Sequence, residues 1–432
     1  MSSSAIKAVI SEWLLERKLP YLVKRNTGPV DLKKLDDILA VVGPRRAGKT
    51  FFMYQLIHEL LESDVPRDEI LFIDFEDYRL TGLTVAEVET IFASFHQLSG
   101  HHPVYLFFDE VHHLPNWSRV LRTLHNQGRY RIIISGSNSQ LLTGEISSEL
   151  RGRYRDLLML PFSLPELLRL KGVDYNRKTF HTPARGSLIR VFDEYLKSGG
   201  FPEVAKRDTE LEKRDLLQSY YRTVFYRDLL DRYNIRAKDV LESLMSYCMD
   251  TAAELFSISR FAGLLQQQGQ PISKKTIANY LGYLRESFFL ILNSKFDFSP
   301  RRRLMNPKKL YLLDTGFSRL ATSFSENRGK YLENIVAIEI LRRRCEMFYF
   351  RRGGECDFIL KKGTRPEQAI QVCWELSPRN RKRELKGLFE AMDTLDLERG
   401  LVLTYDQEGS EQVGGREVPV RPVWKWLLPD GE

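Results

Sequence analysis

Apolar and polar segments alternate regularly in the first third of the chain. Short apolar runs of four to six residues are separated by longer amphipathic stretches. Such runs predict buried strands, and the stretches between them predict helices. The expected strands are residues 38–42, 70–75, 104–108, 131–135 and 157–160. Alternation of strand and helix predicts an α/β core with a parallel sheet and helices on both faces.

The middle of the chain has a helical pattern. It runs from about residue 165 to 233 and is interrupted by Ser198-Gly199-Gly200-Phe201-Pro202. Two amphipathic helices follow at residues 255–265 and 272–284, and a tight polar turn between them predicts a helix-turn-helix. Base or phosphate contacts would come from the start of its second helix, at Ser273, Lys274, Lys275, Thr276 and Asn279. Residues 288–294 and 309–313 are the expected wing strands. Contact with DNA and contact with a protein alone both remain open for this unit.

The last third predicts a second α/β region. A helix is expected at residues 331–344, then strands at 347–350, 356–360 and 369–374, a helix at 383–395 and a strand at 400–404. This order resembles that of a restriction-endonuclease-like core. We therefore expect four domains: an α/β core at 1–162, a helical lid at 163–235, a winged helix at 236–315 and a nuclease-like domain at 316–432.

Composition narrows the class of protein. A chain of 432 residues is too long for one compact core, and its 43% hydrophobic and 28% charged residues are ordinary for a globular protein. There is no apolar run of membrane-spanning length, no signal-peptide core at the start and no C-x-x-C spacing among the four cysteines. We expect a cytoplasmic protein with free thiols and no membrane partner.

The charge distribution points to the C-terminal half. A formal net charge of +8 permits nucleic-acid binding without establishing it. Basic side chains occur there in runs, at Arg301, Arg302, Arg303, Lys308, Lys309, Arg342, Arg343, Arg344, Arg379, Arg381, Lys382 and Arg383. Each run by itself is typical of a solvated face. Together they make this half the expected contact for the phosphate backbone of DNA.

One stretch fits the phosphate-binding pattern G-x-x-x-x-G-K-[ST]. It is Gly43-Pro44-Arg45-Arg46-Ala47-Gly48-Lys49-Thr50. It lies between a predicted strand and a predicted helix, which is the context that the pattern requires. The backbone N–H groups of these eight residues and the helix N-terminus would cradle the phosphates of ATP. Lys49 would reach the β- and γ-phosphates, and the Thr50 hydroxyl would ligate Mg²⁺.

Two acids end the third expected strand. Asp109 would hold the Mg²⁺ of ATP, and Glu110 would polarise the attacking water as general base. After the fourth strand, Ser137 or Asn138 would orient that water, although this segment could equally cap the next helix. Arg151 or Arg153 would stabilise transition-state charge, in cis or from a neighbouring copy in a homo-oligomer. A surface arginine paired with an acid is the alternative.

Five segments in this order resemble a known family. Besides the phosphate loop, they are Phe-Ile-Asp-Phe-Glu-Asp-Tyr-Arg-Leu, Phe-Asp-Glu-Val-His-His-Leu-Pro-Asn-Trp, Ser-Gly-Ser-Asn-Ser-Gln-Leu-Leu and Leu-Arg-Gly-Arg-Tyr. Nearly the whole chain resembles archaeal and bacterial AAA-type ATPases with a C-terminal domain of the DUF4143 type. The resemblance implies that Asp109 and Glu110 form a Walker B motif. It also implies an arginine finger at Arg153, with Arg151 as its neighbour.

The C-terminal region contains part of a nuclease motif. Nucleases of the restriction-endonuclease type use an acid at a strand start and E-x-K on the next strand to bind Mg²⁺ and activate water. Here Glu333 and Asp357 are the candidate acids, and Gln371-Val372-Cys373 stands in place of E-x-K. The Gln371 carbonyl oxygen can still ligate a hard cation, but Cys373 cannot replace a lysine's charge. Glu375 is expected on the same strand face and would supply a missing carboxylate.

These patterns predict a Mg²⁺-dependent ATPase that couples ATP hydrolysis to DNA binding or processing. An active nuclease would use Glu333, Asp357 and Gln371 as metal ligands. The alternative is an ATP-dependent switch that binds a protein partner through an inactive nuclease fold, in which the acids are structural. A small-molecule kinase would share the phosphate loop but would leave the C-terminal regions unexplained.

Overall fold

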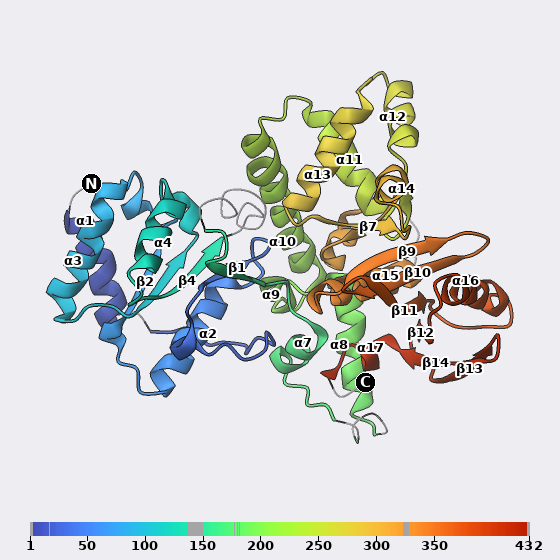
Figure 1. Ribbon diagram of the computed structural model, residues 1–432, viewed down its shortest axis with the longest axis horizontal. Coiled ribbons are helices and arrows are strands. Elements are labelled where there is room, and N and C mark those ends of the chain that lie inside the picture. Colours follow the sequence, from blue (N-terminus) through green and yellow to red (C-terminus); the bar gives the residue numbers. More distant parts are fainter. Residues whose placement is uncertain are drawn as a thin grey trace. The chain divides into compact units, whose positions relative to one another are not determined.

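The computed structural model describes residues 3–16, 18–136, 150–176, 178, 180, 182–322 and 328–429. Contacts divide the chain into two compact units, Met1–Pro161 and Phe162–Glu432. We call them the first unit and the second unit. Figure 1 shows the chain coloured from blue at the N-terminus to red at the C-terminus.

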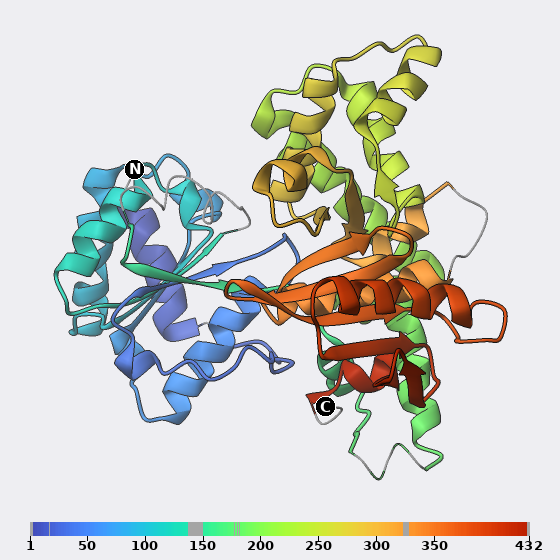
Figure 2. The same ribbon diagram turned by 45° about the vertical axis from the view of Figure 1, so that its right-hand side comes forward.

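The first unit is built on a five-stranded sheet in the order β2-β3-β4-β1-β5. All its pairings are parallel. The strands are β1 (Ile38–Val42), β2 (Ile70–Asp74), β3 (Tyr105–Asp109), β4 (Arg131–Gly136) and β5 (Tyr154–Leu158). The helices are α1 (Ser3–Ser11), α2 (Lys49–Glu62), α3 (Val88–Ser99) and α4 (Trp117–Asn126). Helices lie on both faces of the sheet (Figures 1 and 2), which is why β1 and β3 are buried along their whole length.

The predicted parallel core is confirmed, with one strand shifted. The β5 strand begins at Tyr154 rather than at residue 157, because its first residues are polar and only partly buried at the sheet edge. An edge strand of this kind lacks the continuous apolar run that marks a central parallel strand. β4 lies between β1 and β3, so its carboxyl end is next to the carboxyl ends of the strands that lead to the phosphate loop and to Asp109.

The second unit contains a nine-stranded mixed sheet in the order β13-β14-β12-β11-β10-β9-β7-β8-β6. Its strands are β6 (Leu255–Phe256), β7 (Leu290–Lys295), β8 (Lys308–Leu312), β9 (Glu346–Arg351), β10 (Glu355–Lys362), β11 (Arg365–Val372), β12 (Arg399–Thr404), β13 (Gly409–Val413) and β14 (Arg416–Pro422). The two expected wing strands are β7 and β8, and they belong to the same sheet as the C-terminal strands. The four-domain division stays a prediction.

Helices make up the rest of the second unit. They are α7 (Leu164–Leu170), α8 (Arg185–Ser198), α9 (Pro202–Ala205), α10 (Glu210–Thr223), a π-helical segment (Val224–Asp231), α11 (Lys238–Asp250), α12 (Ile258–Gln267), α13 (Lys274–Glu286), α14 (Pro300–Met305), α15 (Arg328–Arg342), α16 (Arg381–Thr394) and α17 (Val423–Trp426). α12 and α13 form the expected helix pair. Ser273 caps α13 by accepting from the Thr276 N–H, and Lys274, Lys275 and Asn279 are exposed.

A buried carboxylate holds the Gly199-Gly200 turn. Asp314 accepts hydrogen bonds from the Gly200 N–H at 2.7 Å and the Gly316 N–H at 2.8 Å. Gly199 has φ +73°, and a Cβ there would lie 1.6 Å from the Asp314 Oδ1 atom, so only glycine fits. Burial raises the pKa of Asp314 to about 6 although both N–H groups lower it. The turn between α8 and α9 is therefore fixed by a residue more than 110 positions away.

Candidate functional site

The phosphate loop has the backbone that anion binding requires. Gly43 has φ +157°, and a Cβ there would lie 2.0 Å from the Met159 carbonyl oxygen. Gly48 is left-handed at φ +93° and precedes α2 without a side-chain cap. The N–H groups of the first turn of α2 have no partner within the helix and carry its positive dipole end. This is the arrangement in which helix N-termini bind phosphate.

The Lys49 side chain lies across the loop and is buried. Its Nζ atom donates to the carbonyl oxygens of Gly43 at 3.3 Å and Pro44 at 3.2 Å. The same Nζ atom is 3.7 Å from the Glu110 Oε1 atom. Hydrogen bonds of this length to neutral carbonyls are weak for an ammonium group. Lys49 can therefore turn toward a phosphate at small cost.

The predicted magnesium ligands are in contact. The Thr50 hydroxyl donates to the Asp109 Oδ2 atom at 2.6 Å. Asp109 is almost fully buried, and burial raises its pKa to about 6 against the lowering effect of hydrogen bonds from Ser135 and Thr50. A hydroxyl from the first turn of α2 and a carboxylate from the end of β3 suit the Mg²⁺ of a nucleotide. These residues fit the cofactor that the loop implies.

Glu110 sits in a strained backbone conformation next to the loop. Its φ is +46°, which is costly for a residue with a side chain and occurs mainly at functional sites. Its N–H donates to the Ser135 hydroxyl at 3.0 Å, and its Oε2 atom is 3.4 Å from the His112 Nδ1 atom. Burial lowers the pKa of His112 to about 4, so this imidazole is neutral at pH 7. Glu110 is therefore held beside the loop by its backbone bond to Ser135, and its carboxylate lies 3.7 Å from the Lys49 ammonium.

Sequence reasoning missed Ser135 and His112 in this site. Ser135 is fully buried at the end of β4 and donates to the Asp109 Oδ1 atom as well as accepting from Glu110. The expected polar residue after β4 was placed two or three positions later, at Ser137 or Asn138. Both of those residues lie outside the described part of the chain. The sequence signal that could have identified Ser135 is a serine among the last, buried positions of a predicted strand.

The arginine candidates are at the amino ends of the strands, opposite the phosphate loop. β5 pairs in parallel with β1 so that Tyr154 lies beside Ile38, and the Arg153 carbonyl accepts from the Ile38 N–H. Val42 is four residues after Ile38, which is about 13 Å along a strand. The structure therefore does not bring Arg151 or Arg153 to the phosphate loop of the same chain. In contrast, Arg45 of the loop lies 3.8 Å from Glu76 after β2.

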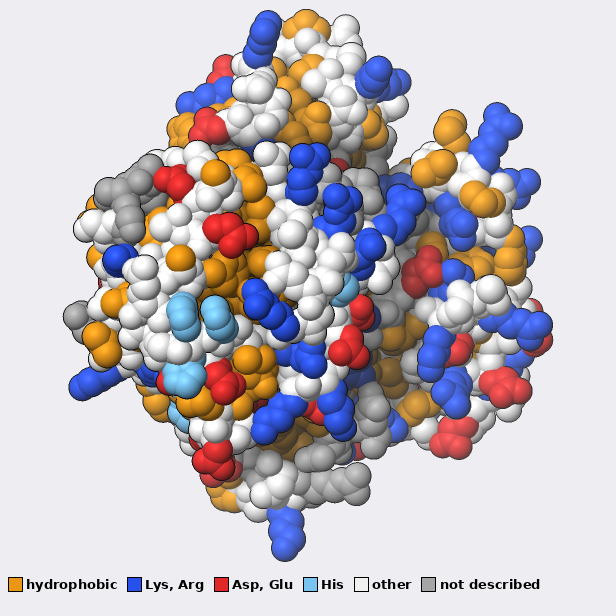
Figure 3. Space-filling view, turned by 60° about the vertical axis from the view of Figure 1, so that its left-hand side comes forward, with side chains coloured by type: hydrophobic (Ala, Val, Ile, Leu, Met, Phe, Trp, Pro, Cys, Tyr) orange, Lys and Arg blue, Asp and Glu red, His pale blue; other side chains and the backbone are white. Residues whose placement is uncertain are grey.

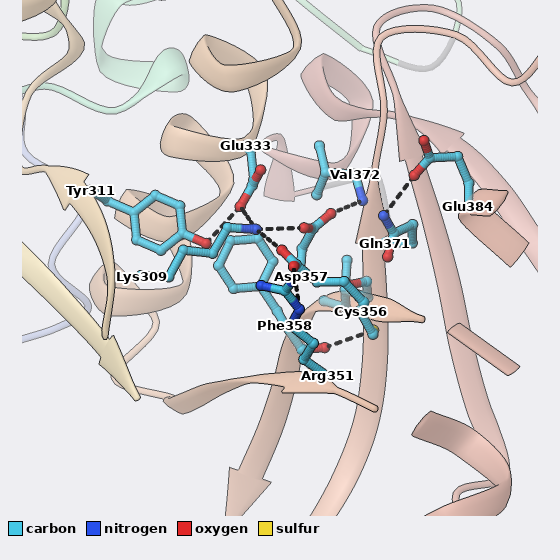
Figure 4. A network of polar contacts seen from close by, with 12 residues as sticks. Lys309, Tyr311, Glu333, Arg351, Cys356, Asp357, Phe358, Gln371, Val372 and Glu384 are labelled. Carbon is cyan, nitrogen blue, oxygen red and sulfur yellow. Dashed lines mark hydrogen bonds and ion pairs between the residues drawn. The ribbon is translucent and has the colours of Figure 1, made fainter. Parts of the chain in front are cut away.

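A second polar site lies in the second unit, around Lys309 (Figure 4). The Lys309 Nζ atom contacts three carboxylates, those of Glu333 at 2.7 Å, Glu355 at 2.9 Å and Asp357 at 2.8 Å. We call these four residues the Lys309 cluster. They come from β8, α15 and β10. Each of the three N–H groups of the ammonium can therefore donate to a carboxylate.

The cluster is buried and further hydrogen-bonded. The Tyr311 hydroxyl donates to Glu333 at 2.6 Å, and the Val372 N–H donates to the Asp357 Oδ2 atom at 2.9 Å. Burial alone would lower the pKa of Lys309, but the attraction of Asp357 and Glu333 raises it well above its ordinary value. Burial raises the pKa of Glu333 to about 8. Lys309 is thus a fixed positive charge within a group of acids.

Gln371 lies beside this cluster and has an unused oxygen. Its Nε2 atom donates to the Glu384 Oε2 atom of α16 at 2.8 Å, and Asp357 bonds to the neighbouring residue Val372. The Gln371 Oε1 atom is buried and has no hydrogen-bond partner among the described residues. Because Glu384 accepts hydrogen bonds, the amide nitrogen must face it and the oxygen must face away. A buried amide oxygen without a donor can accept a hydrogen bond from water or ligate a cation.

All of these residues line one open cleft of about 940 Å³. Lys309, Glu333, Glu355, Asp357, Gln371 and Glu384 are among its acidic and polar lining. Besides Lys309, its basic lining residues are Lys330, Arg379, Lys382, Arg383 and Lys386. On the face in Figure 3, basic and acidic side chains are interspersed, so the net charge does not form one continuous basic surface there. The local cleft is therefore a better guide to a ligand than the overall charge.

Three expectations about this region need correction. Lys309 was expected in a basic run that contacts phosphate backbones, but it is only 3% exposed and is engaged by carboxylates. The strand was expected to run to residue 374, but β11 ends at Val372, so Cys373 and Glu375 lie beyond it. Glu375 is exposed, and the carboxylate next to Gln371 is that of Glu384 instead. Glu333, Asp357 and Gln371 do line the same cleft, as the sequence predicted.

Family comparisons agree with the fold of the first unit. Residues 35–168 match the model of an AAA domain, and residues 189–328 match a domain of unknown function, DUF8612. The chain therefore contains an AAA-type P-loop ATPase domain. The DUF4143 part of the resemblance is not confirmed by these matches. Among the described residues, no helix is both long and apolar enough to cross a membrane.

Two curated relatives match almost the whole chain. An uncharacterized protein of Methanocaldococcus jannaschii is 33% identical over 411 residues, which cover 92% of this chain and 90% of the relative. An uncharacterized protein of Haemophilus influenzae is 27% identical over 407 residues, which cover 92% of this chain and 96% of the relative. The chain belongs to the family of the Methanocaldococcus jannaschii protein.

Two solved structures show weaker likeness. The Walker-type ATPase of Pyrococcus abyssi is 16% identical with a TM-score of 0.42, over 67% of this chain and 91% of that one. The ORC1 protein of Aeropyrum pernix, solved in complex with DNA, is 13% identical with a TM-score of 0.28, over 79% and 93% of the two chains. Because both TM-scores lie below 0.5, we infer nothing about function from them.

Proposed function

We propose that the protein is a Mg²⁺-dependent ATPase whose ATP hydrolysis is coupled to DNA binding or processing in the second unit. The observation that carries the DNA part is the cleft of about 940 Å³, which combines buried carboxylates with five basic side chains besides Lys309. Phosphodiester backbones are bound by cations, and enzymes that cut them place carboxylates with a divalent cation at the phosphate. A cleft with both features suits a polynucleotide strand.

In the ATPase half, each described site residue has a distinct role. The loop N–H groups and Lys49 would hold the phosphates, and Thr50 and Asp109 would hold Mg²⁺. The Mg²⁺ supplies charge neutralisation between the β- and γ-phosphates. Glu110 would accept the proton of the attacking water, while Ser135 fixes the positions of Asp109 and the Glu110 backbone. A second copy is a proposed partner, because Arg151 or Arg153 would have to act in trans.

The exposed start of α13 is the second proposed DNA contact. Lys274, Lys275 and Asn279 are exposed there, and the Ser273 cap fixes the helix N-terminus. Side chains in these positions reach base edges or phosphates in helix-turn-helix proteins.

An ATP-dependent switch that binds a protein partner is the second candidate. The observation in its favour is that Lys309 occupies the middle of the acids. Within the described ranges, no three acidic, histidine or cysteine side chains are spaced to hold a metal ion. An inactivated nuclease fold would retain its acids as an ion-pair network of this kind.

The test measures ATP hydrolysis by the full chain with and without duplex DNA, and checks that DNA for cuts in Mg²⁺ and in Mn²⁺. The first candidate predicts DNA-stimulated hydrolysis, with any cutting removed by Asp357→Ala. A matched control is Glu367→Ala, an exposed acid on β11. Hydrolysis that is indifferent to DNA, with the DNA intact, would favour the protein-partner switch.

A further inference from the structure

Strand β11 lacks the lysine that completes an E-x-K motif. Cys373 stands in that position and is buried. A thiol carries no positive charge, so this side chain cannot replace the lysine. A positive charge would have to come from another element.

Lys309 provides such a charge from β8, 48 positions before Asp357 in the sequence. On β8 its ladder partners are residues of β6 and β7, so nothing in the local strand pattern marks it for the acids of β10. Its side chain nonetheless ends 2.8 Å from Asp357, the acid whose other oxygen bonds to the end of β11. In Figure 4 the Lys309 ammonium lies between Glu333 and Asp357.

The missing carboxylate is also supplied from elsewhere. Gln371 occupies the glutamate position of the motif, and the buried Glu384 carboxylate of α16 bonds to its amide nitrogen. This contact leaves the Gln371 Oε1 atom without a donor. Both parts that β11 lacks, a lysine and a glutamate, therefore lie next to the site but come from other elements.

We propose that Lys309 is the positioning ammonium of a divalent-cation site formed by Asp357, Gln371 and Glu333. This inference deepens the proposed function and rests on it for the phosphodiester substrate. Lys309 holds the carboxylates of Glu333 and Asp357 in one orientation and reduces their mutual repulsion. The cation would be held on the side of the unused Gln371 oxygen, and Lys309 itself makes no bond to the substrate.

The test moves the charge instead of only removing it. Lys309→Met deletes the ammonium, and Lys309→Met with Cys373→Lys restores it from the motif position on the β11 side. Mn²⁺ binding is measured on the full chain by electron paramagnetic resonance, with Asp357→Asn as the zero reference. Mn²⁺-dependent cutting of duplex DNA is measured in parallel.

Removal of the Lys309 charge should strengthen Mn²⁺ binding, because the ammonium repels a cation nearby. A variant that has lost its fold would not bind Mn²⁺ at all. We therefore expect Lys309→Met to bind Mn²⁺ about tenfold more tightly at the Asp357-dependent site while cutting falls at least tenfold. The double variant should return both quantities toward those of the wild type. If Lys309→Met does not fold, Lys309→Arg is measured in its place. The positive charge stays, but a planar guanidinium cannot direct its N–H groups to three carboxylates as the ammonium does. Cutting should then fall while the Mn²⁺ affinity stays near that of the wild type.

Three results would overturn the inference. The first is that the wild type shows no Asp357-dependent Mn²⁺ binding. The second is that Lys309→Met has the Mn²⁺ affinity and the cutting rate of the wild type. The third is that the double variant recovers neither the Mn²⁺ affinity nor the cutting rate. The proposed function fails separately. If Mn²⁺ binding follows the expected pattern but DNA is neither cut nor able to stimulate ATP hydrolysis, the positioning role stands and the DNA function falls.

Discussion

The two sites each contain a buried lysine beside carboxylates, but the lysines are held differently. Lys49 donates to two carbonyl oxygens at 3.2–3.3 Å and is 3.7 Å from the Glu110 carboxylate. Lys309 has three carboxylates within 2.9 Å. The first lysine can exchange its contacts for a phosphate, whereas the second would leave buried acids unpaired if it moved. The difference separates a lysine that binds substrate from one that holds a site in shape.

The largest effect should come from the lysine that exchanges its contacts. Lys49→Ala removes charge-assisted hydrogen bonds to two phosphates, each worth about 2 kcal/mol, so ATP affinity should fall ~1,000-fold. Equilibrium binding of a fluorescent ATP analogue measures it. The control is Lys34→Ala, whose side chain is 87% exposed. Unchanged affinity would remove the phosphate-loop role.

Substitution of the neighbouring acid, Glu110, should slow ATP hydrolysis without preventing ATP binding. Glu110→Gln keeps the size of the side chain but cannot accept a proton, so hydrolysis should fall ~1,000-fold while ATP still binds. Steady-state phosphate release measures the rate, with the exposed Glu62→Gln on α2 as the matched control. Normal turnover would exclude Glu110 as the base.

Substitution of Lys309 should reduce the free energy of unfolding more than substitution of Lys49 does. Lys309→Met leaves Glu333 and Asp357 without their cation and should cost roughly 3 kcal/mol of unfolding free energy. Lys49→Met loses two long bonds to carbonyls and a 3.7 Å contact with Glu110, and should cost less, about 1 kcal/mol. Urea unfolding of each full-length variant, followed separately for the two units by hydrogen exchange, gives both values. Equal losses would contradict the contrast.

Asp314 extends the comparison to a buried carboxylate that has no lysine beside it in the contacts described above. Its hydrogen-bond donors are backbone N–H groups. Its pKa rises from 3.8 to about 6 on folding. Between these values the folded protein holds a proton that the unfolded chain has lost. Its contribution therefore favours folding most below about pH 4 and is lost as the pH rises through 6.

The test compares the wild type with Asp314→Asn, which does not titrate at this position. From pH 4 to pH 7, the unfolding free energy of the wild type should fall relative to that of the variant by on the order of 2 kcal/mol. Urea unfolding at both pH values measures this difference. A difference that does not change with pH would show that Asp314 keeps its ordinary pKa.

The sequence predicted the ATPase half much better than the cleft. β1, Lys49, Thr50, Asp109 and Glu110 lie in or beside continuous motifs at the ends of apolar strands, so their spacing implies their neighbours. Ser135 and His112 were missed because a single serine or histidine near a strand end has many other uses. The backbone strain at Glu110 also has no sequence signal.

The Lys309 cluster could be predicted only in part. Glu333 and Asp357 were identified because a strand and a helix of a nuclease-like order each carried an acid. Lys309 and Glu384 were not identified as members of the cleft. They lie on β8 and α16, and the local sequence pattern marks them only as an ordinary strand residue and an ordinary helix residue. Their proximity depends on how β8 and α16 pack against β10 and β11, which residue spacing does not encode.

The most direct test of the account is the rate of ATP hydrolysis by the full chain with and without duplex DNA. The account predicts that DNA raises this rate and that Asp357→Ala removes any accompanying Mg²⁺- or Mn²⁺-dependent cutting while leaving basal hydrolysis in place. A rate that DNA does not change, with the DNA intact in both metals, would contradict the coupling of the ATPase to the cleft.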